Sequence, residues 1–81
     1  MKYIMYESPS QGYVPILFPA TMSHNEINRV ILNEWPGFVP VTAGEVKLND
    51  NKEVVAFGHS QTLKLQSQPD DSVFISIALR S

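Results

Sequence analysis

Two short apolar runs open the chain and differ from the segments that follow. Residues 2–7, KYIMYE, and residues 13–18, YVPILF, are rich in aromatic and β-branched side chains, and the turn-forming segment SPSQG separates them. This pattern predicts two strands joined in a hairpin. Because Pro15 has no N–H group to donate to a neighbouring strand, we expect the second strand to lie at an edge of the sheet or to face solvent there.

The apolar period changes to that of a helix over residues 22–37, MSHNEINRVILNEWPG. Ser23 and Glu26 have the spacing of a capping box, which predicts the first residue of the helix. The Pro-Gly pair predicts its end. The three-and-four spacing predicts a core-facing stripe made of Ile27, Val30, Ile31 and Trp35. Trp35 is therefore expected in the core rather than on a binding surface.

From Val39 onward apolar residues recur at every second position, which is the period of a strand. The phase of this alternation slips at Gly44-Glu45, where we expect a β-bulge. Residues 49–52, NDNK, are predicted to form a hairpin loop, and residues 53–58, EVVAFG, the returning strand. The segment TLKL either continues that strand or begins another.

Residues 54–65, VVAFGHSQTLKL, allow two interpretations. As one continuous strand they place His59 and Gln61 on an apolar face, where each buried and unpaired polar side chain costs about 1–3 kcal/mol and needs a partner. Alternatively, Gly58 breaks the strand and residues 58–61, GHSQ, form a solvated loop. We expect the break.

The last segment, residues 66–81, also has two interpretations. Ser67 and Asp70 have capping-box spacing, and the adjacent carboxylates of Asp70 and Asp71 favour the positive end of a helix. We therefore expect a helix within residues 68–80, with the two aspartates as its cap rather than as an acid–base pair. The competing strand is supported by the strict alternation of Val73, Ile75, Ile77 and Leu79.

These elements predict an α+β fold in which an antiparallel sheet carries two packed helices, in the order ββαββ(β)α, within a single domain spanning residues 1–81. A core of this size contributes about 3–5 kcal/mol of net stability, and the chain has no cysteine to form a disulfide. We therefore expect a homo-oligomer.

Charge and hydropathy restrict the range of partners. The formal net charge is −2 and the six basic residues are scattered, which speaks against binding duplex nucleic acid. No apolar stretch approaches the ~20 residues of a membrane span, and the N-terminus lacks the apolar block of a signal peptide. The sequence predicts a cytoplasmic protein without a membrane partner.

The sequence contains no recognisable catalytic motif. Its four isolated glycines form neither a dinucleotide fingerprint nor a phosphate-binding loop. Two histidines without cysteine do not make a catalytic zinc site. In a strand, His59 and Ser60 point to opposite faces, which is poor geometry for a base and its nucleophile. We expect no enzyme activity, no metal and no cofactor.

Two further groups of residues are candidates for binding. His24 stands at the predicted start of the helix, where free N–H groups attract anions, although we interpret it as an exposed helix-start residue. Tyr3, Tyr6 and Tyr13 indicate either an interface, where tyrosine is enriched, or ordinary packing of strands.

Three short motifs resemble a group of small phage and prophage proteins. They are SH-x-E at residues 23–26, TAG-x-V at residues 42–46, and FG-x-S-x-TL-x-L-x-S-x-PDD at residues 57–71. Glu45 and Gln68 depart from that pattern. The resemblance implies a viral origin and a protein that acts by binding, such as a counter-defence inhibitor that sequesters a nucleotide signal or blocks a host defence protein.

A nucleotide-sequestering inhibitor needs polar contacts and a positive charge for the phosphate. The expected ligand-binding residues are Gly58, His59, Ser60, Gln61 and Thr62, with Arg29 or Arg80 neutralising the phosphate. The alternative function is a structural or assembly protein of the phage particle, in which the first hairpin and its edge strand pair with another chain.

Overall fold

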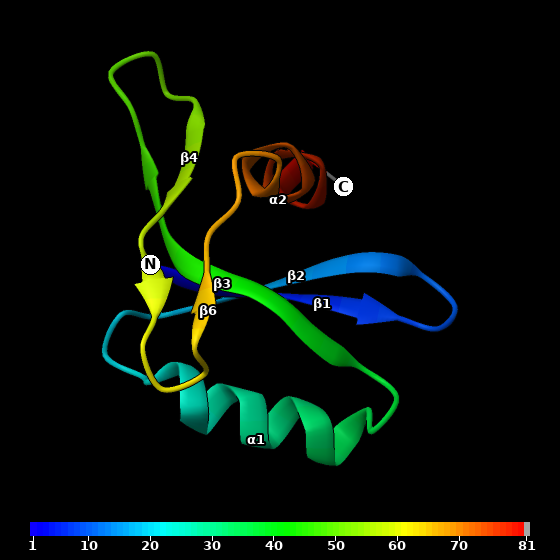
Figure 1. The fold of residues 1–81 in the computed structure, drawn as a ribbon. Helices are drawn as coiled ribbons and strands as arrows, with labels where there is room; N and C mark the ends of the chain where they lie inside the picture. Colours follow the sequence, from blue (N-terminus) through cyan, green and yellow to red (C-terminus); the bar gives the residue numbers. More distant parts are fainter. Residues whose placement is uncertain (81) are drawn as a thin grey trace.

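Residues 1–80, which the computed structural model describes, form two helices, a four-stranded sheet and a small second hairpin (Figure 1). The elements are β1 (Lys2–Ser8), β2 (Gly12–Phe18), α1 (His24–Glu34), β3 (Val39–Leu48), β4 (Val54–Phe57), β5 (His59–Ser60), β6 (Leu65–Gln66) and α2 (Asp71–Arg80). The predicted α+β class and the antiparallel sheet with two helices are confirmed. Among these residues, neither helix is long and apolar enough to cross a membrane.

The larger sheet has the strand order β2-β1-β3-β4, and all neighbouring strands are antiparallel. Pro15 lies in the edge strand β2, as expected for a residue without an N–H group. Helix α1 covers one face of the sheet and α2 covers the other (Figure 1). Strand β1 is therefore enclosed by a strand on each side and a helix on each face.

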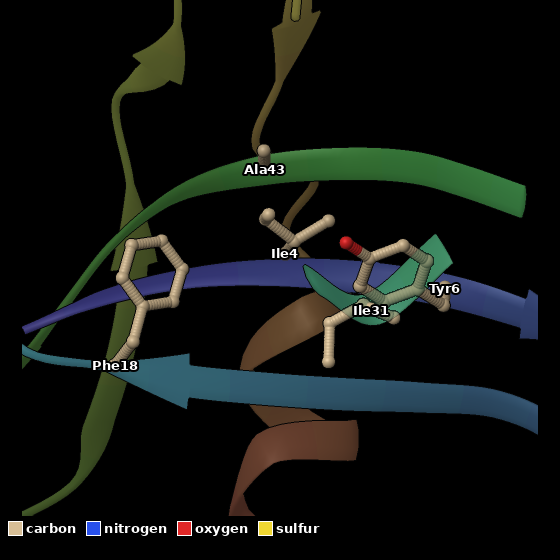
Figure 2. Packing of buried hydrophobic residues seen from close by; sticks show 5 residues of the cluster. All are labelled: Ile4, Tyr6, Phe18, Ile31 and Ala43. Carbon is tan, nitrogen blue, oxygen red and sulfur yellow. The ribbon is translucent and has the colours of Figure 1, made fainter. Parts of the chain in front are cut away.

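This enclosure explains why residues 3–6, YIMY, are all fully buried. Successive side chains of a strand point to opposite faces. Ile4 and Tyr6 face α1 and pack with Phe18, Ile31 and Ala43, as Figure 2 shows. Tyr3 and Met5 face α2 and pack against Ile75.

The predicted bulge is displaced along β3. Met5 lies opposite Thr42 and Tyr6 lies opposite Pro40, so the extra residue is Val41 rather than Gly44-Glu45. The prediction was wrong because it assumed one apolar face. Both faces of this sheet are covered, so a strand can change the face that carries its apolar residues without an inserted residue.

Helix α1 begins as predicted. The Glu26 N–H donates to Ser23 Oγ at 3.1 Å, and the Ser23 N–H donates to Glu26 Oε1 at 3.3 Å, which completes the capping box. The buried side of α1 differs from the predicted stripe, because Val30 and Trp35 are 57% and 50% exposed. Trp35 is the C-cap residue, and its non-helical backbone takes its side chain out of the helical phase, onto the ring of Phe38.

We predict that Ser23→Ala lowers the free energy of unfolding by about 1 kcal/mol, because the first turn of α1 loses the acceptor for the Glu26 N–H. Urea denaturation followed by circular dichroism measures this change. Ser10→Ala is the matched control, since Ser10 lies in the exposed turn between β1 and β2. An equal effect of the two substitutions contradicts the role of Ser23 as a cap.

Gly58 breaks the strand, as expected, with φ at +77°. The segment after it is not the solvated loop that we predicted. His59 and Ser60 pair with residues 65–66 in a short hairpin. Leu63 and Leu65 pack against the core on the α1 side of the sheet. Burial of these two side chains favours the hairpin, because it holds residues 65–66 beside residues 59–60.

The C-terminal segment is the helix α2, which confirms the favoured interpretation. Of its four alternating apolar residues only Ile75 is buried. The capping contact is shifted by one residue from the predicted pair, because the carboxylate of Asp71, not that of Asp70, accepts the N–H of Gln68 at 3.0 Å.

Candidate functional site

The predicted ligand-binding segment, residues 58–62, contains β5 and the start of the turn that leads to β6. His59, Gln61 and Thr62 are exposed, whereas Ser60 is buried. The Ser60 hydroxyl oxygen accepts the N–H of Leu63 at 3.3 Å and thereby closes the turn. The buried Ser60 hydroxyl therefore holds this hairpin together, and the exposed side chains of His59, Gln61 and Thr62 lie around it.

The two arginines expected to neutralise phosphate lie far apart in the fold. Arg29 is exposed on α1 and borders a shallow concavity with Val30 and Leu32. Arg80 lies at the end of α2, on the opposite side of the sheet (Figure 1). Neither concavity that these arginines border includes any of residues 58–62. The structure does not gather the predicted phosphate-binding set into one cavity.

His24 is buried rather than exposed, which corrects the interpretation made from its position in the sequence. Its Nε2 atom lies 3.0 Å from the carbonyl oxygen of Gly44, and its ring meets the ring of Phe18 edge to face at 5.3 Å. These contacts join the first turn of α1 to β3. His24 therefore has a packing role, and its side chain is directed into the molecule instead of toward an anion in solvent.

Two of the three tyrosines considered for an interface lie inside the molecule. The hydroxyl of Tyr3 donates to the carboxylate of Asp71, and that of Tyr6 donates to Asn28 Oδ1 at 2.8 Å. Burial raises the pKa of both phenols above the ordinary value, and for Tyr3 the hydrogen bond to Asp71 adds to this effect. Tyr13 is the one of the three that is exposed, on the edge strand β2.

The largest concavity described in the structure is a groove between the β3–β4 hairpin and α2, here called the hairpin–helix groove. Its volume is about 690 Å³. The hairpin projects beyond the sheet beside α2 (Figure 1). The residues that line the groove are Leu48, Lys52, Glu53, Val54, Ser72, Val73, Ser76, Leu79 and Arg80.

Hydrogen bonds hold both walls of the groove in place. Strand β4 is the edge of the sheet on this side, and the N–H of Ala56 donates to Ser72 Oγ on α2 at 3.0 Å. In the tip of the hairpin, Asn49 Oδ1 accepts the N–H groups of Asn51 and Glu53, both at 2.9 Å. One wall of the groove is therefore the hydrogen-bonded β3–β4 hairpin, and the other is α2, which is hydrogen-bonded to the edge strand β4.

The side chains that face the groove combine apolar walls with a charged rim. Val73 and Leu79 on α2 are 58% and 59% exposed, and Leu48 on the hairpin is also exposed. Lys52 and Arg80 contribute two positive charges to the rim, and Glu53 contributes one negative charge. Exposed apolar side chains beside charged ones in a single concavity are typical of interaction sites.

The described residues contain no cluster of three or more histidine, aspartate and glutamate side chains able to hold a metal ion. The sequence did not reveal the groove, because its two walls come from separate segments of the chain, residues 48–54 and residues 72–80. The only local feature of the sequence that relates to the groove is the alternation of apolar residues over positions 73–79. That pattern, once folded as a helix, leaves apolar side chains on the surface.

Comparison of the chain with models of protein families, with curated proteins and with solved structures finds no match.

Proposed function

We propose that this protein is a non-catalytic binding protein. It binds a segment of a partner protein in the hairpin–helix groove and thereby blocks that partner. The observation that carries the proposal is the exposure of Leu48, Val73 and Leu79 around one concavity. Single exposed apolar residues are normal on protein surfaces, whereas apolar residues gathered in a groove with a polar rim are typical of interaction sites.

The chemistry of the groove favours a peptide segment over a nucleotide. Burial of apolar side chains is the main source of affinity available between Leu48 and the exposed side of α2. The polar residues proposed for nucleotide contacts, residues 58–62, lie outside this groove. A nucleotide signal is therefore the less well supported of the two ligands considered from the sequence.

The rim indicates the charge of the docked segment. The chain carries a net charge of −2, yet Lys52 and Arg80 outnumber Glu53 at the groove. Complementary potentials at an interface favour the correct partner and exclude like-charged ones. We propose a partner segment with apolar side chains inserted between Leu48 and Leu79 and acidic side chains beside the two cations.

The biological setting that we propose is that of a phage or prophage accessory protein with a counter-defence role, acting on a host protein in the infected cell. This part rests on the resemblance of the motifs at residues 23–26, 42–46 and 57–71 to small phage proteins. An inhibitor that binds a segment of its partner in a groove needs no catalytic residues.

Selection of peptides from a random 12-residue library on the purified protein tests the docking proposal. We expect the wild-type chain to enrich peptides in which apolar residues are flanked by aspartate or glutamate. Leu79→Glu should abolish this enrichment, because it places a negative charge in the groove next to Arg80. Since Leu79 is exposed, the substitution is expected to change stability by no more than about 0.5 kcal/mol.

Val30→Glu is the matched control, because Val30 has nearly the same exposure as Leu79 but lies on α1, across the sheet. This variant should enrich the same peptides as the wild type. Two results contradict the proposal: the absence of any enriched peptide class, and an enriched class that Leu79→Glu leaves unchanged.

A further inference from the structure

A second cavity, here called the aromatic pocket, lies between the start of α2 and the face of the sheet that α2 covers. Its volume is about 250 Å³, several times the ~30 Å³ that one water molecule occupies in the liquid. The lining residues are Met5, Tyr13, Val41, Thr42, Gln68, Asp70, Asp71 and Phe74. The aromatic pocket shares no residue with the hairpin–helix groove.

Two aromatic rings form one wall of the aromatic pocket. The rings of Tyr13 and Phe74 meet edge to face, with centroids 5.3 Å apart. Tyr13 is exposed although it lies beside the partly buried Phe74, so its ring is accessible from solvent. The face of an aromatic ring carries partial negative charge and attracts cations.

A buried carboxylate lies in the same pocket. Asp71 is only 4% exposed, and its side chain accepts the hydroxyl of Tyr3 and the N–H of Gln68. A carboxylate has about four acceptor positions, so these two neutral donors do not saturate it. No lysine or arginine lines the aromatic pocket. These two donors and the positive end of α2 stabilise the Asp71 carboxylate, and no cationic side chain of the pocket lining competes for its remaining acceptor positions.

Further oxygen atoms extend this acceptor surface. Thr42 also lines the pocket, and its buried hydroxyl lies near that of Tyr3. Asp70 and Gln68 are exposed residues that also line the pocket, so their side chains stand where it opens to solvent. The pocket thus combines two carboxylates and an amide with an aromatic wall.

We propose that the aromatic pocket binds a guanidinium group. Guanidinium is planar, carries five N–H donors, pairs with carboxylates through two parallel hydrogen bonds and stacks on aromatic rings. These properties match the carboxylates of Asp70 and Asp71 and the rings of Tyr13 and Phe74. The group belongs either to an arginine side chain of a protein partner or to a free small molecule, and the two sources share this chemistry.

Nuclear magnetic resonance titration of the ¹⁵N-labelled full chain tests the proposal. The probes are agmatine, as a free guanidinium compound, and the capped tripeptide acetyl-Gly-Arg-Gly-amide. We expect saturable shifts at the amides of Tyr13, Gln68 and residues 70–74. Tighter binding of the tripeptide assigns the site to a partner's arginine, and tighter binding of agmatine assigns it to a small molecule.

The matched ligand control is the same tripeptide with citrulline, which keeps the shape of arginine without its charge. Asp70→Asn should raise the Kd of the better probe about five- to tenfold, because one charge-assisted contact is lost. The capping contact of α2 is made by Asp71 rather than by Asp70, so α2 is expected to remain folded in this variant. Asp50→Asn, in the exposed loop between β3 and β4, should leave the Kd unchanged.

Three outcomes overturn the proposal: no saturable shift with either probe, equal binding of the citrulline tripeptide, or equal loss of affinity in the variants of Asp70 and Asp50. The aromatic pocket and the hairpin–helix groove have no residue in common, so failure of this experiment leaves the docking of a peptide in the groove untouched.

Discussion

Gly44→Ala is expected to destabilise the protein by about 3 kcal/mol, the upper part of the usual range for overpacking a core. A Cβ atom at this position would lie 2.3 Å from the carbonyl oxygen of Phe57 and 3.2 Å from Cβ of Ser67. The oxygen belongs to the backbone, so it moves only if the chain leaving β4 moves with it. The same shift would disturb the Gly44 carbonyl that contacts His24 Nε2.

Urea denaturation of Gly44→Ala and Gly37→Ala measures this effect against a matched control. At Gly37 the nearest atom to an added Cβ is Pro9 Cγ at 3.3 Å, which belongs to a side chain in an exposed turn. We expect Gly37→Ala to change stability by less than about 1 kcal/mol. Equal midpoints for the two variants would show that Gly44 is not in close contact with Phe57 and Ser67.

Ile75→Ala is expected to lower the free energy of unfolding by about 2–5 kcal/mol, the range for truncating a buried isoleucine. Ile75 is fully buried and packs against Tyr3 and Met5 on β1. A domain of this size has a net stability of about 3–5 kcal/mol. If the loss is about 5 kcal/mol, the variant is expected to be largely unfolded in the absence of urea. Circular dichroism without urea measures how much of the variant is unfolded, and the urea midpoint measures the loss of stability.

Val73→Ala is the matched control for Ile75→Ala, because both residues belong to the alternating apolar set of α2 and Val73 is exposed. We expect Val73→Ala to change stability by no more than about 0.5 kcal/mol. The pair also separates helix from strand in solution. In a strand packed on the core, residues 73 and 75 share a face, and the two substitutions would cost similar amounts.

The candidate sites were predicted less completely than the fold. The strand does break at Gly58 as predicted, but His59 and Ser60 form the short strand β5 rather than a loop. Whether Arg29 or Arg80 shares a cavity with them could not be predicted, because it depends on which face of the sheet each helix covers. The hairpin–helix groove and the aromatic pocket were missed for the same reason: each joins α2 to strands that are distant in the sequence.

The sequence by itself determined the features that depend on near neighbours. The capping box of Ser23 and Glu26, the turn at residues 49–52 and the break at Gly58 each require only hydrogen bonds or backbone angles within a few residues. Such interactions are present whatever the rest of the chain does. For that reason the order of strands and helices could be predicted along most of the chain.

Only the tertiary structure decided which apolar and polar side chains are buried. Trp35 is exposed and His24 is buried, although the helical pattern indicated the opposite for each. The pairing of β3 with β1 makes Val41 the extra residue of β3. The hydroxyl of Tyr3 on β1 donates a hydrogen bond to the carboxylate of Asp71, which is buried there. Burial depends on the surfaces that meet when distant segments pack, and an amino-acid pattern read along one element does not contain the partner of that element.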